Sequence, residues 1–202
     1  MIKPKTEEEA ILELVRAQGA IRTRDLKAHG LSRQALIRLH EKGILNRPSR
    51  GLYILVDADF TQHHSLAEAA KLVPSGVVCL LSALRFHDLT TQAPFEVWIA
   101  IANKRWKPVV RYPPLRIVRF STLALDYGVE EHRVEEVKVR IYSASKTVAD
   151  CFKYRNKIGI DVAIEALRDC VVQRKATMDQ LWAAAKVCRM TNIMRPYMEA
   201  VA

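Results

Sequence analysis

The 202-residue sequence contains only seven glycines, and none of them lies in a recognisable phosphate-binding loop. The patterns GxGxxG and GxxxxGKS are absent, which excludes the common loops that hold nucleotide phosphates on glycine backbone. The GxSxG elbow of α/β-hydrolases is missing as well. Ser82 and His87 could form a nucleophile–base pair, although an ordinary helix surface explains them equally well. We therefore expect a protein without catalytic residues or a cofactor, rather than an enzyme.

Cysteine is also scarce, and its four positions are far apart in the chain: Cys79, Cys151, Cys170 and Cys188. No CxxC motif occurs, so the spacing typical of zinc ligands is absent. The adjacent His63 and His64 would face different sides of a helix and could not easily chelate one metal ion. Each cysteine stands among apolar residues, so we expect buried free thiols and no metal site.

Long apolar runs are missing too. No segment approaches the roughly 20 apolar residues that a membrane span requires. The N-terminal stretch MIKPKTEEEA is polar and does not have the character of a signal peptide. These observations predict a cytoplasmic protein with no membrane partner.

What the sequence has in excess is positive charge, with 32 Lys and Arg against 22 Asp and Glu. Residues 1–56 carry 11 basic and 6 acidic side chains, a net charge of +5, and the other 146 residues share the remaining +5. The charge density is therefore highest near the N-terminus. This asymmetry favours a nucleic-acid partner, whose binding would weaken steeply with salt.

Residues 19–55, GAIRTRDLKAHGLSRQALIRLHEKGILNRPSRGLYIL, predict a winged helix-turn-helix. A short helix capped by Thr23 would end at Gly30, and Ser32 would cap a second helix that stops at Gly43. In that second helix the 3.6-residue spacing places Ala35, Leu36 and Leu39 on one buried face. Ile44–Arg47 and Leu52–Leu55 predict two strands, joined by a turn through Pro48, Ser49, Arg50 and Gly51.

The exposed face of the second helix is the candidate DNA-reading surface. Side chains near the start of a recognition helix meet base edges, where Arg matches guanine and Gln matches adenine. We therefore expect Arg33, Gln34 and Arg38 to select the sequence, with Ile37 available for a thymine methyl group. The residues expected to touch phosphates or the minor groove are Arg22, Arg24, Lys27, Ser32, Lys42, Arg47, Ser49 and Arg50. Two alternatives are that these side chains are merely solvated, or that the module binds only protein.

The rest of the chain predicts an α+β fold, in which a C-terminal α+β domain has a small sheet and a helical tail. The expected domains are 1–56, a linker at 57–62, and 63–202. The N-terminal domain would open with a helix at 6–18. In the second domain, helices are expected at His64–Leu72 and Val77–His87, and strands at Phe95–Ala102, Leu115–Phe120, Val129–Val134 and Val137–Tyr142. The tail helices are expected at Lys146–Lys157, Ile160–Arg174, Met178–Cys188 and around Tyr197.

Both halves of the chain resemble the AbiEi antitoxins of abortive-infection, type IV toxin–antitoxin systems. In the first half the resemblance lies in LHEKGILNRPSRGLYIL, where Arg50, Gly51 and Tyr53 match the family's R-G-x-Y strand. In the second half it lies in VVCLLSALRFHDL, the strand around VWIA, and the stretch YSASKTVADCFKYRNKIGIDVAIEAL. There the family's S-x-x-[RK]-T-x-x-D pattern and the turn after it fall on Lys146, Thr147, Asp150, Arg155 and Gly159.

The resemblance implies two functions, divided between the domains. The N-terminal domain would bind inverted repeats in its own promoter and repress the operon. The C-terminal domain would counteract a nucleotidyltransferase toxin, in defence against phage, without forming a stable complex. The chain would be a monomer in solution that can occupy paired DNA sites cooperatively. The alternatives are a plain transcriptional regulator with a ligand-sensing or assembly domain, and an enzyme that modifies the toxin covalently.

Two further groups of residues could form a second nucleic-acid or antitoxic surface. The segment 103–120 is basic with interleaved Trp106 and Tyr112, and it offers Lys104, Arg105, Lys107 and Arg111. The simpler interpretation is a solvated loop whose aromatic rings pack on the sheet. The expected helix at 146–157 offers Lys146, Asp150, Lys153 and Arg155. Lys146 and Asp150 are i,i+4 neighbours that could pair, and we expect them on a solvated helix face.

Overall fold

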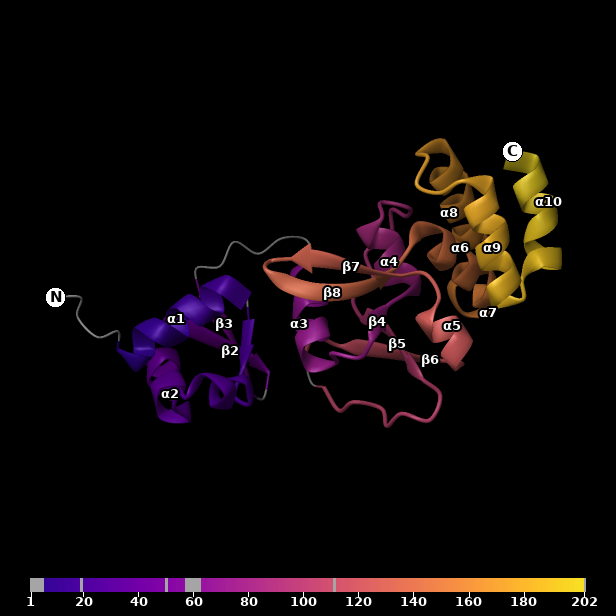
Figure 1. The fold of residues 1–202 in the computed structure, drawn as a ribbon. Coiled ribbons are helices and arrows are strands. Elements are labelled where there is room, and N and C mark those ends of the chain that lie inside the picture. Colours follow the sequence, from indigo (N-terminus) through magenta and orange to yellow (C-terminus); the bar gives the residue numbers. More distant parts are fainter. Residues whose placement is uncertain (1–5, 19, 50, 57–62, 111, 202) are drawn as a thin grey trace. The chain divides into compact units, whose positions relative to one another are not determined.

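The computed structural model describes residues 6–18, 20–49, 51–56, 63–110 and 112–201, and its elements are labelled in Figure 1. The chain divides into two compact units. The first comprises Met1–Pro74, Pro108–Pro114 and Arg133–Val139, and the second comprises Ser75–Lys107, Leu115–His132 and Arg140–Ala202. The predicted linker at 57–62 lies outside the described residues.

The first unit contains three helical elements, a three-stranded antiparallel sheet and a further helix. Its elements are α1 (Glu7–Gln18), β1 (Ala20–Arg22), the 3-10 helix η1 (Asp25–His29), α2 (Arg33–Glu41), β2 (Leu45–Ser49), β3 (Leu52–Leu55) and α3 (His64–Leu72). The strand order is β1-β3-β2. We call the part from α1 to β3 the head region. Apolar side chains from each of its elements, including Ile11, Leu26, Leu36 and Tyr53, form one core.

Helix α3 groups with the first unit, whereas the sequence predicts that the second domain begins at residue 63. The reason is a small apolar cluster in which Ala20, Leu52 and Ile54 are buried and Leu72 packs against them. Arg22 strengthens this contact because its Nη2 donates to the carbonyl oxygen of Leu72 at 3.2 Å.

The turn before α2 differs from its prediction in one respect. Thr23 does not cap η1, since the N-cap residue is Arg24 and no side chain caps that helix. The hydroxyl of Thr23 instead donates to the carbonyl of Gly51 in the hairpin turn. Gly30 ends η1 in the left-handed conformation with φ 65°, as its position predicts.

The first strand of the hairpin after α2 extends further than predicted, because β2 ends at Ser49 and not at Arg47. Pro48 and Ser49 therefore belong to the strand and not to the turn. The strand β1 was not predicted at all; it pairs antiparallel with β3, Ile21 opposite Tyr53.

The second unit is built on a five-stranded sheet in the order β6-β5-β4-β8-β7, although the adjoining ends of β7 and β8 within Arg133–Val139 group with the first unit. Its strands are β4 (Val77–Val78), β5 (Val97–Ala102), β6 (Leu115–Phe120), β7 (Val129–Val134) and β8 (Val137–Tyr142), with α4 (Leu80–Phe86) and α5 (Thr122–Asp126) between them. The predicted helix at 77–87 is wrong at its start. Val77 and Val78 pair with β5 on one side, and Val78 pairs with β8 on the other.

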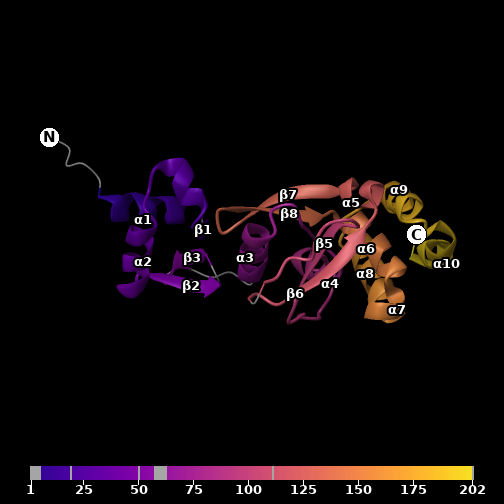
Figure 2. The ribbon, with the colours of Figure 1, turned by 90° about the horizontal axis from the view of Figure 1, so that it is seen from below.

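A cluster of helices completes the second unit: α6 (Ala144–Lys153), α7 (Arg155–Ile158), α8 (Ile160–Val172), α9 (Met178–Cys188) and α10 (Thr191–Val201). Helix α6 packs against α4, α8, α9 and α10, and Figure 2 shows these C-terminal helices gathered together. The helix predicted at 146–157 is interrupted at Tyr154, which closes α6 and opens α7. The α+β class is confirmed. In the described part of the chain, no helix is long and apolar enough to cross a bilayer.

Candidate nucleic-acid interface

Helix α2 presents a polar face to solvent, as its spacing predicts. Ala35, Leu36 and Leu39 are fully buried in the head core. Arg33 and Gln34 lie in the first turn with exposed side chains. Arg38 is also exposed, one turn further along, and Ile37 is partly buried. The four residues expected to read bases therefore lie outside the core on one short helix.

The start of α2 is fixed by Ser32. Its hydroxyl oxygen accepts from the backbone N–H of Ala35 at 3.2 Å, which satisfies one of the free donors of the first turn. The same hydroxyl donates to Glu7 Oε2 at 2.8 Å, so α1 and α2 are tied together at this point. Ser32 was expected to touch phosphate, but its hydroxyl already has both a donor and an acceptor role here.

Glu8 of α1 neutralises the second half of the polar face. Its carboxylate contacts Arg38 Nε at 3.5 Å and Lys42 Nζ at 2.7 Å. All three side chains are solvated, so each pair is worth at most about 1 kcal/mol and exchanges readily for another anion. The side chains of Arg33 and Gln34 make no hydrogen bond or ion pair with the rest of the described chain. The strongest unsatisfied donors of α2 thus lie in its first turn.

Two further predicted contacts flank α2. Lys27 on η1 and Arg47 on β2 are both exposed. The guanidinium of Arg47 lies 5.7 Å from the centre of the Tyr53 ring, which orients it along the hairpin. Arg50 lies outside the described residues, as does the side chain of Ser49.

Arg22 and Arg24 are placed differently from the expectation. Arg22 is half-buried, and burial together with the neighbouring charge of Arg24 lowers the pKa of its guanidinium. Arg24 is exposed and contacts Asp25 at 3.7 Å. Both residues line a cavity with Lys71 of α3, instead of extending the exposed face of α2.

The comparison with known families bears on this same region. Residues 9–56 match the model of a family described as "Transcriptional regulator, AbiEi antitoxin". This region is thus similar to AbiEi-type transcriptional regulators. The match begins within α1 and ends just after β3, so it covers the head with α2 and the hairpin. No curated protein matches the chain.

The AbiEi match supports an antitoxin or transcriptional-regulator role for the chain. The match does not extend to residues 77–167, which carry the resemblance in the second half of the chain.

The basic loop after β5 is exposed, including its tryptophan. Lys104, Arg105 and Lys107 are solvated, and Trp106 has 93% of its surface exposed. The expectation that the loop's aromatic rings pack on the sheet is therefore wrong for Trp106. Arg119 of β6 holds the loop by donating to the carbonyl oxygens of Asn103 and Arg105, at 3.2 and 3.1 Å. Arg111 lies outside the described residues.

Lys146 and Asp150 pair as predicted, but they are not on a solvated face. Their side chains are 0% and 1% exposed, and Lys146 Nζ donates to Asp150 Oδ2 at 2.5 Å. The ammonium group also lies 4.2 Å from the ring centre of Tyr142 and 4.7 Å from that of Phe120. Cys188 Sγ donates to the other carboxylate oxygen at 3.2 Å. Because both side chains are buried, they cannot form part of a nucleic-acid or antitoxic surface directly.

The pair is buried because α6 lies inside the helical cluster and every residue from Ala144 to Phe152 is covered. Burial raises the pKa of the Asp150 carboxyl, although the charge of Lys146 opposes that shift. It also raises the pKa of the Cys188 thiol to about 12, with the carboxylate of Asp150 adding to the effect. The short Lys146–Asp150 distance and the burial of both side chains describe an ion pair inside the core.

The remaining predicted positions have simple structural roles. Lys153 is exposed at the end of α6, and Arg155 donates to the carbonyl oxygen of Phe152 at 2.9 Å. Ser82 accepts from the backbone N–H of Trp98, while His87 contacts the carbonyl oxygen of Tyr142 at 2.7 Å. Ser82 and His87 therefore each bond to backbone. The four cysteines are buried free thiols, as predicted.

Proposed function

We propose that the chain is a DNA-binding antitoxin that represses its own operon. In this proposal the head region is a winged helix-turn-helix, with α2 as the recognition helix and the β2–β3 hairpin as the wing. The second unit supplies protection against a nucleotidyltransferase toxin encoded beside it, without a stable complex between the two proteins. No catalytic step is assigned to the chain, which acts on DNA as a monomer able to fill inverted repeats cooperatively.

The observation that supports this proposal most strongly is the exposed first turn of α2. Arg33 and Gln34 project from the opposite side of the helix to the buried Ala35 and Leu36. The N-terminal residues of a recognition helix are the ones that reach base edges in the major groove. A bidentate Arg–guanine contact is worth about 1–3 kcal/mol of discrimination between bases.

The ion pairs around Glu8 add a second element to the proposal. DNA phosphates can replace Glu8 as the partner of Arg38 and Lys42, since exposed ion pairs are weak and are screened by salt. Lys27 and Arg47 would contribute further phosphate contacts. Binding should therefore weaken markedly as salt concentration rises.

A pair of assays in cells tests the two roles separately. A reporter gene fused to the protein's own promoter should be repressed by the wild-type chain and derepressed with Arg33→Ala. The matched control is Arg168→Ala, which removes an exposed arginine from α8 in the second unit. Repression by the control variant should equal that of the wild type.

The toxin of the adjacent gene is then expressed from an unrelated promoter, together with each variant. Arg33→Ala should still protect the cells, because protection is assigned to the second unit. Loss of protection with Arg33→Ala, at normal protein levels, would contradict this division of roles. Full repression by Arg33→Ala would contradict the assignment of α2.

A further inference from the structure

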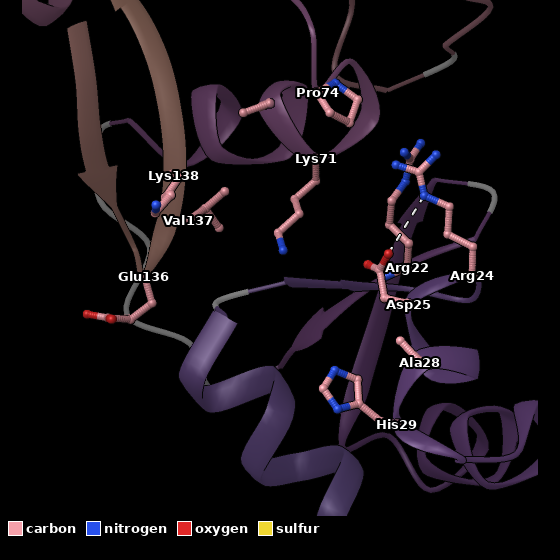
Figure 3. Close-up of a pocket in the computed structure, with 11 residues that line it drawn as sticks. Arg22, Arg24, Asp25, Ala28, His29, Lys71, Pro74, Glu136, Val137 and Lys138 are labelled. Carbon is pink, nitrogen blue, oxygen red and sulfur yellow. Dashed lines mark hydrogen bonds and ion pairs between the residues drawn. The ribbon is translucent and has the colours of Figure 1, made fainter.

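The first unit contains a cavity of about 550 Å³ beside η1. Three segments line it: the β1–η1 region, the C-terminal half of α3, and the turn between β7 and β8 (Figure 3). Lys71 extends from α3 toward the centre of this group, and the side chains of Arg22 and Arg24 lie beside one another on the β1 side. Its lining residues are Arg22, Arg24, Asp25, Ala28, His29, Ala70, Lys71, Pro74, Glu136, Val137 and Lys138.

The cavity lining holds four cations, Arg22, Arg24, Lys71 and Lys138, against two carboxylates, each of which already contacts an arginine. The carboxylate of Asp25 contacts Arg24 and accepts from the backbone N–H of Arg22 at 3.0 Å. Glu136 forms an ion pair with Arg133 on the same turn. The ammonium group of Lys71 makes no hydrogen bond or ion pair with other residues that the structure describes. The Arg22 side chain donates to a backbone carbonyl, which is a neutral partner.

Burial and neighbouring charges shift the pKa values of two of these cations. Burial lowers the pKa of Lys71; the charge of Asp25 opposes that shift, and the charges of Arg22 and Arg24 add to it. The pKa of Arg22 is lowered in the same way, by burial and then by Arg24. Half-buried cations that repel one another are stabilised by an anion placed between them.

The size of the cavity and the apolar part of its lining indicate which kind of anion would fill it. Ligand pockets typically measure about 300–1,000 Å³, so a single inorganic anion would leave most of this cavity unfilled. Ala28, Ala70, Pro74 and Val137 supply apolar surface beside the cations. Among the lining residues, His29 carries an aromatic ring that could stack on a base.

We propose that this cavity binds a small phosphorylated organic molecule. Its phosphate group would lie between Arg22, Arg24 and Lys71, and its carbon skeleton would contact the apolar lining. The two arginines, which the sequence suggested as DNA contacts, would thereby serve an effector site distinct from the recognition helix. This site is separate from the proposed DNA-binding and antitoxic roles.

Isothermal titration calorimetry on the full-length protein tests the proposal, with AMP as a phosphorylated organic probe and inorganic phosphate as the small anion. All titrations are run at one ionic strength set with chloride. AMP should bind at least several-fold more tightly than phosphate because it alone can use the apolar lining. Equal binding of the two would overturn the proposed ligand class, and absence of binding by AMP would overturn the site.

Variants then locate the binding. Lys71→Met keeps most of the side-chain volume, removes the charge and breaks no described hydrogen bond, so it should fold normally. It should weaken AMP binding by on the order of tenfold, as expected for the loss of one charge-assisted contact. Lys27→Met is the matched control, since Lys27 is an exposed lysine of η1 that does not line the cavity, and it should leave AMP affinity unchanged.

A DNA titration separates this site from the DNA surface. Without AMP, Lys71→Met should bind a promoter duplex as tightly as the wild type. If Lys71→Met weakened DNA binding and left AMP binding intact, the cavity cations would belong to the DNA interface and the proposal would be wrong. Arg22→Met provides a second test, and it too should weaken AMP binding relative to Lys27→Met.

Discussion

The buried ion pair of α6 yields the sharpest stability prediction, through the substitution Asp150→Asn. Asparagine keeps the shape of the side chain but removes the charge that balances Lys146. The ammonium group would then remain in the core, held only by an amide oxygen and by the two aromatic rings. Those rings cannot replace the carboxylate, since a desolvated cation–π contact is worth only about 2 kcal/mol.

The expected loss is about 3–5 kcal/mol, the range for breaking one side of a buried ion pair. Domains of this size are typically stable by about 5–15 kcal/mol, so the variant would lose a large fraction of its stability. Replacing both residues, as in Lys146→Met with Asp150→Leu, should restore most of the loss because no buried charge is left. Lys146→Met, Asp150→Leu and the double variant therefore form a strongly non-additive cycle.

Urea unfolding followed by tryptophan fluorescence measures these differences, because Trp98 and Trp182 both belong to the second unit. Since the chain has two units, the transition of the second unit must be fitted separately. Glu96→Gln is the matched control: it breaks the solvent-accessible ion pair with Arg116, which also lies in the second unit, and should cost at most about 1 kcal/mol. An Asp150→Asn cost as small as that of the control would refute the reasoning.

Three further predictions concern the first unit. Glu8→Gln should raise affinity for DNA several-fold at low salt, measured by fluorescence anisotropy, because it frees two basic side chains of α2; unchanged affinity would argue against their contact with phosphate. Gly30→Ala should cost about 1 kcal/mol in urea unfolding, since φ is 65° there and an added Cβ would meet no other atom within 4 Å. The pKa of His64 is raised despite its burial, because Glu68 and Glu135 favour the charged ring. The stability that the charged ring contributes should be complete below about pH 6.5 and decline as pH rises through the raised pKa. In urea unfolding, the wild type should therefore be more stable than His64→Gln at low pH, and this difference should shrink as pH rises. A difference that does not change with pH would contradict the prediction.

The parts of the fold that depend on local pattern were predictable from the sequence. The spacing of Ala35, Leu36 and Leu39 identified the buried face of α2, and Ser32 and Gly30 marked the ends of the turn. Strands β6, β7 and β8 also begin and end where their alternation suggests. In each case the decisive interactions lie within a few residues of one another.

The parts that depend on distant partners were not predictable in the same way. Charges four residues apart usually indicate a solvated helix face, and only the packing of α4, α8, α9 and α10 around α6 buries Lys146 and Asp150. Strand β4 is two residues long and exists because β5 and β8 lie on either side of it. The cavity around Lys71 combines segments that are more than 40 residues apart in the chain, so no local pattern could reveal it.

The central claim is that α2 reads DNA through its first turn, and fluorescence anisotropy on two labelled duplexes tests it most directly. One duplex carries the protein's own promoter and the other an unrelated sequence, at one fixed salt concentration. Arg33→Ala should weaken promoter binding by about 1–3 kcal/mol, roughly 5- to 150-fold, while binding to the unrelated duplex falls much less. Equal losses on both duplexes would make Arg33 a phosphate contact, and unchanged binding to the promoter would contradict the account.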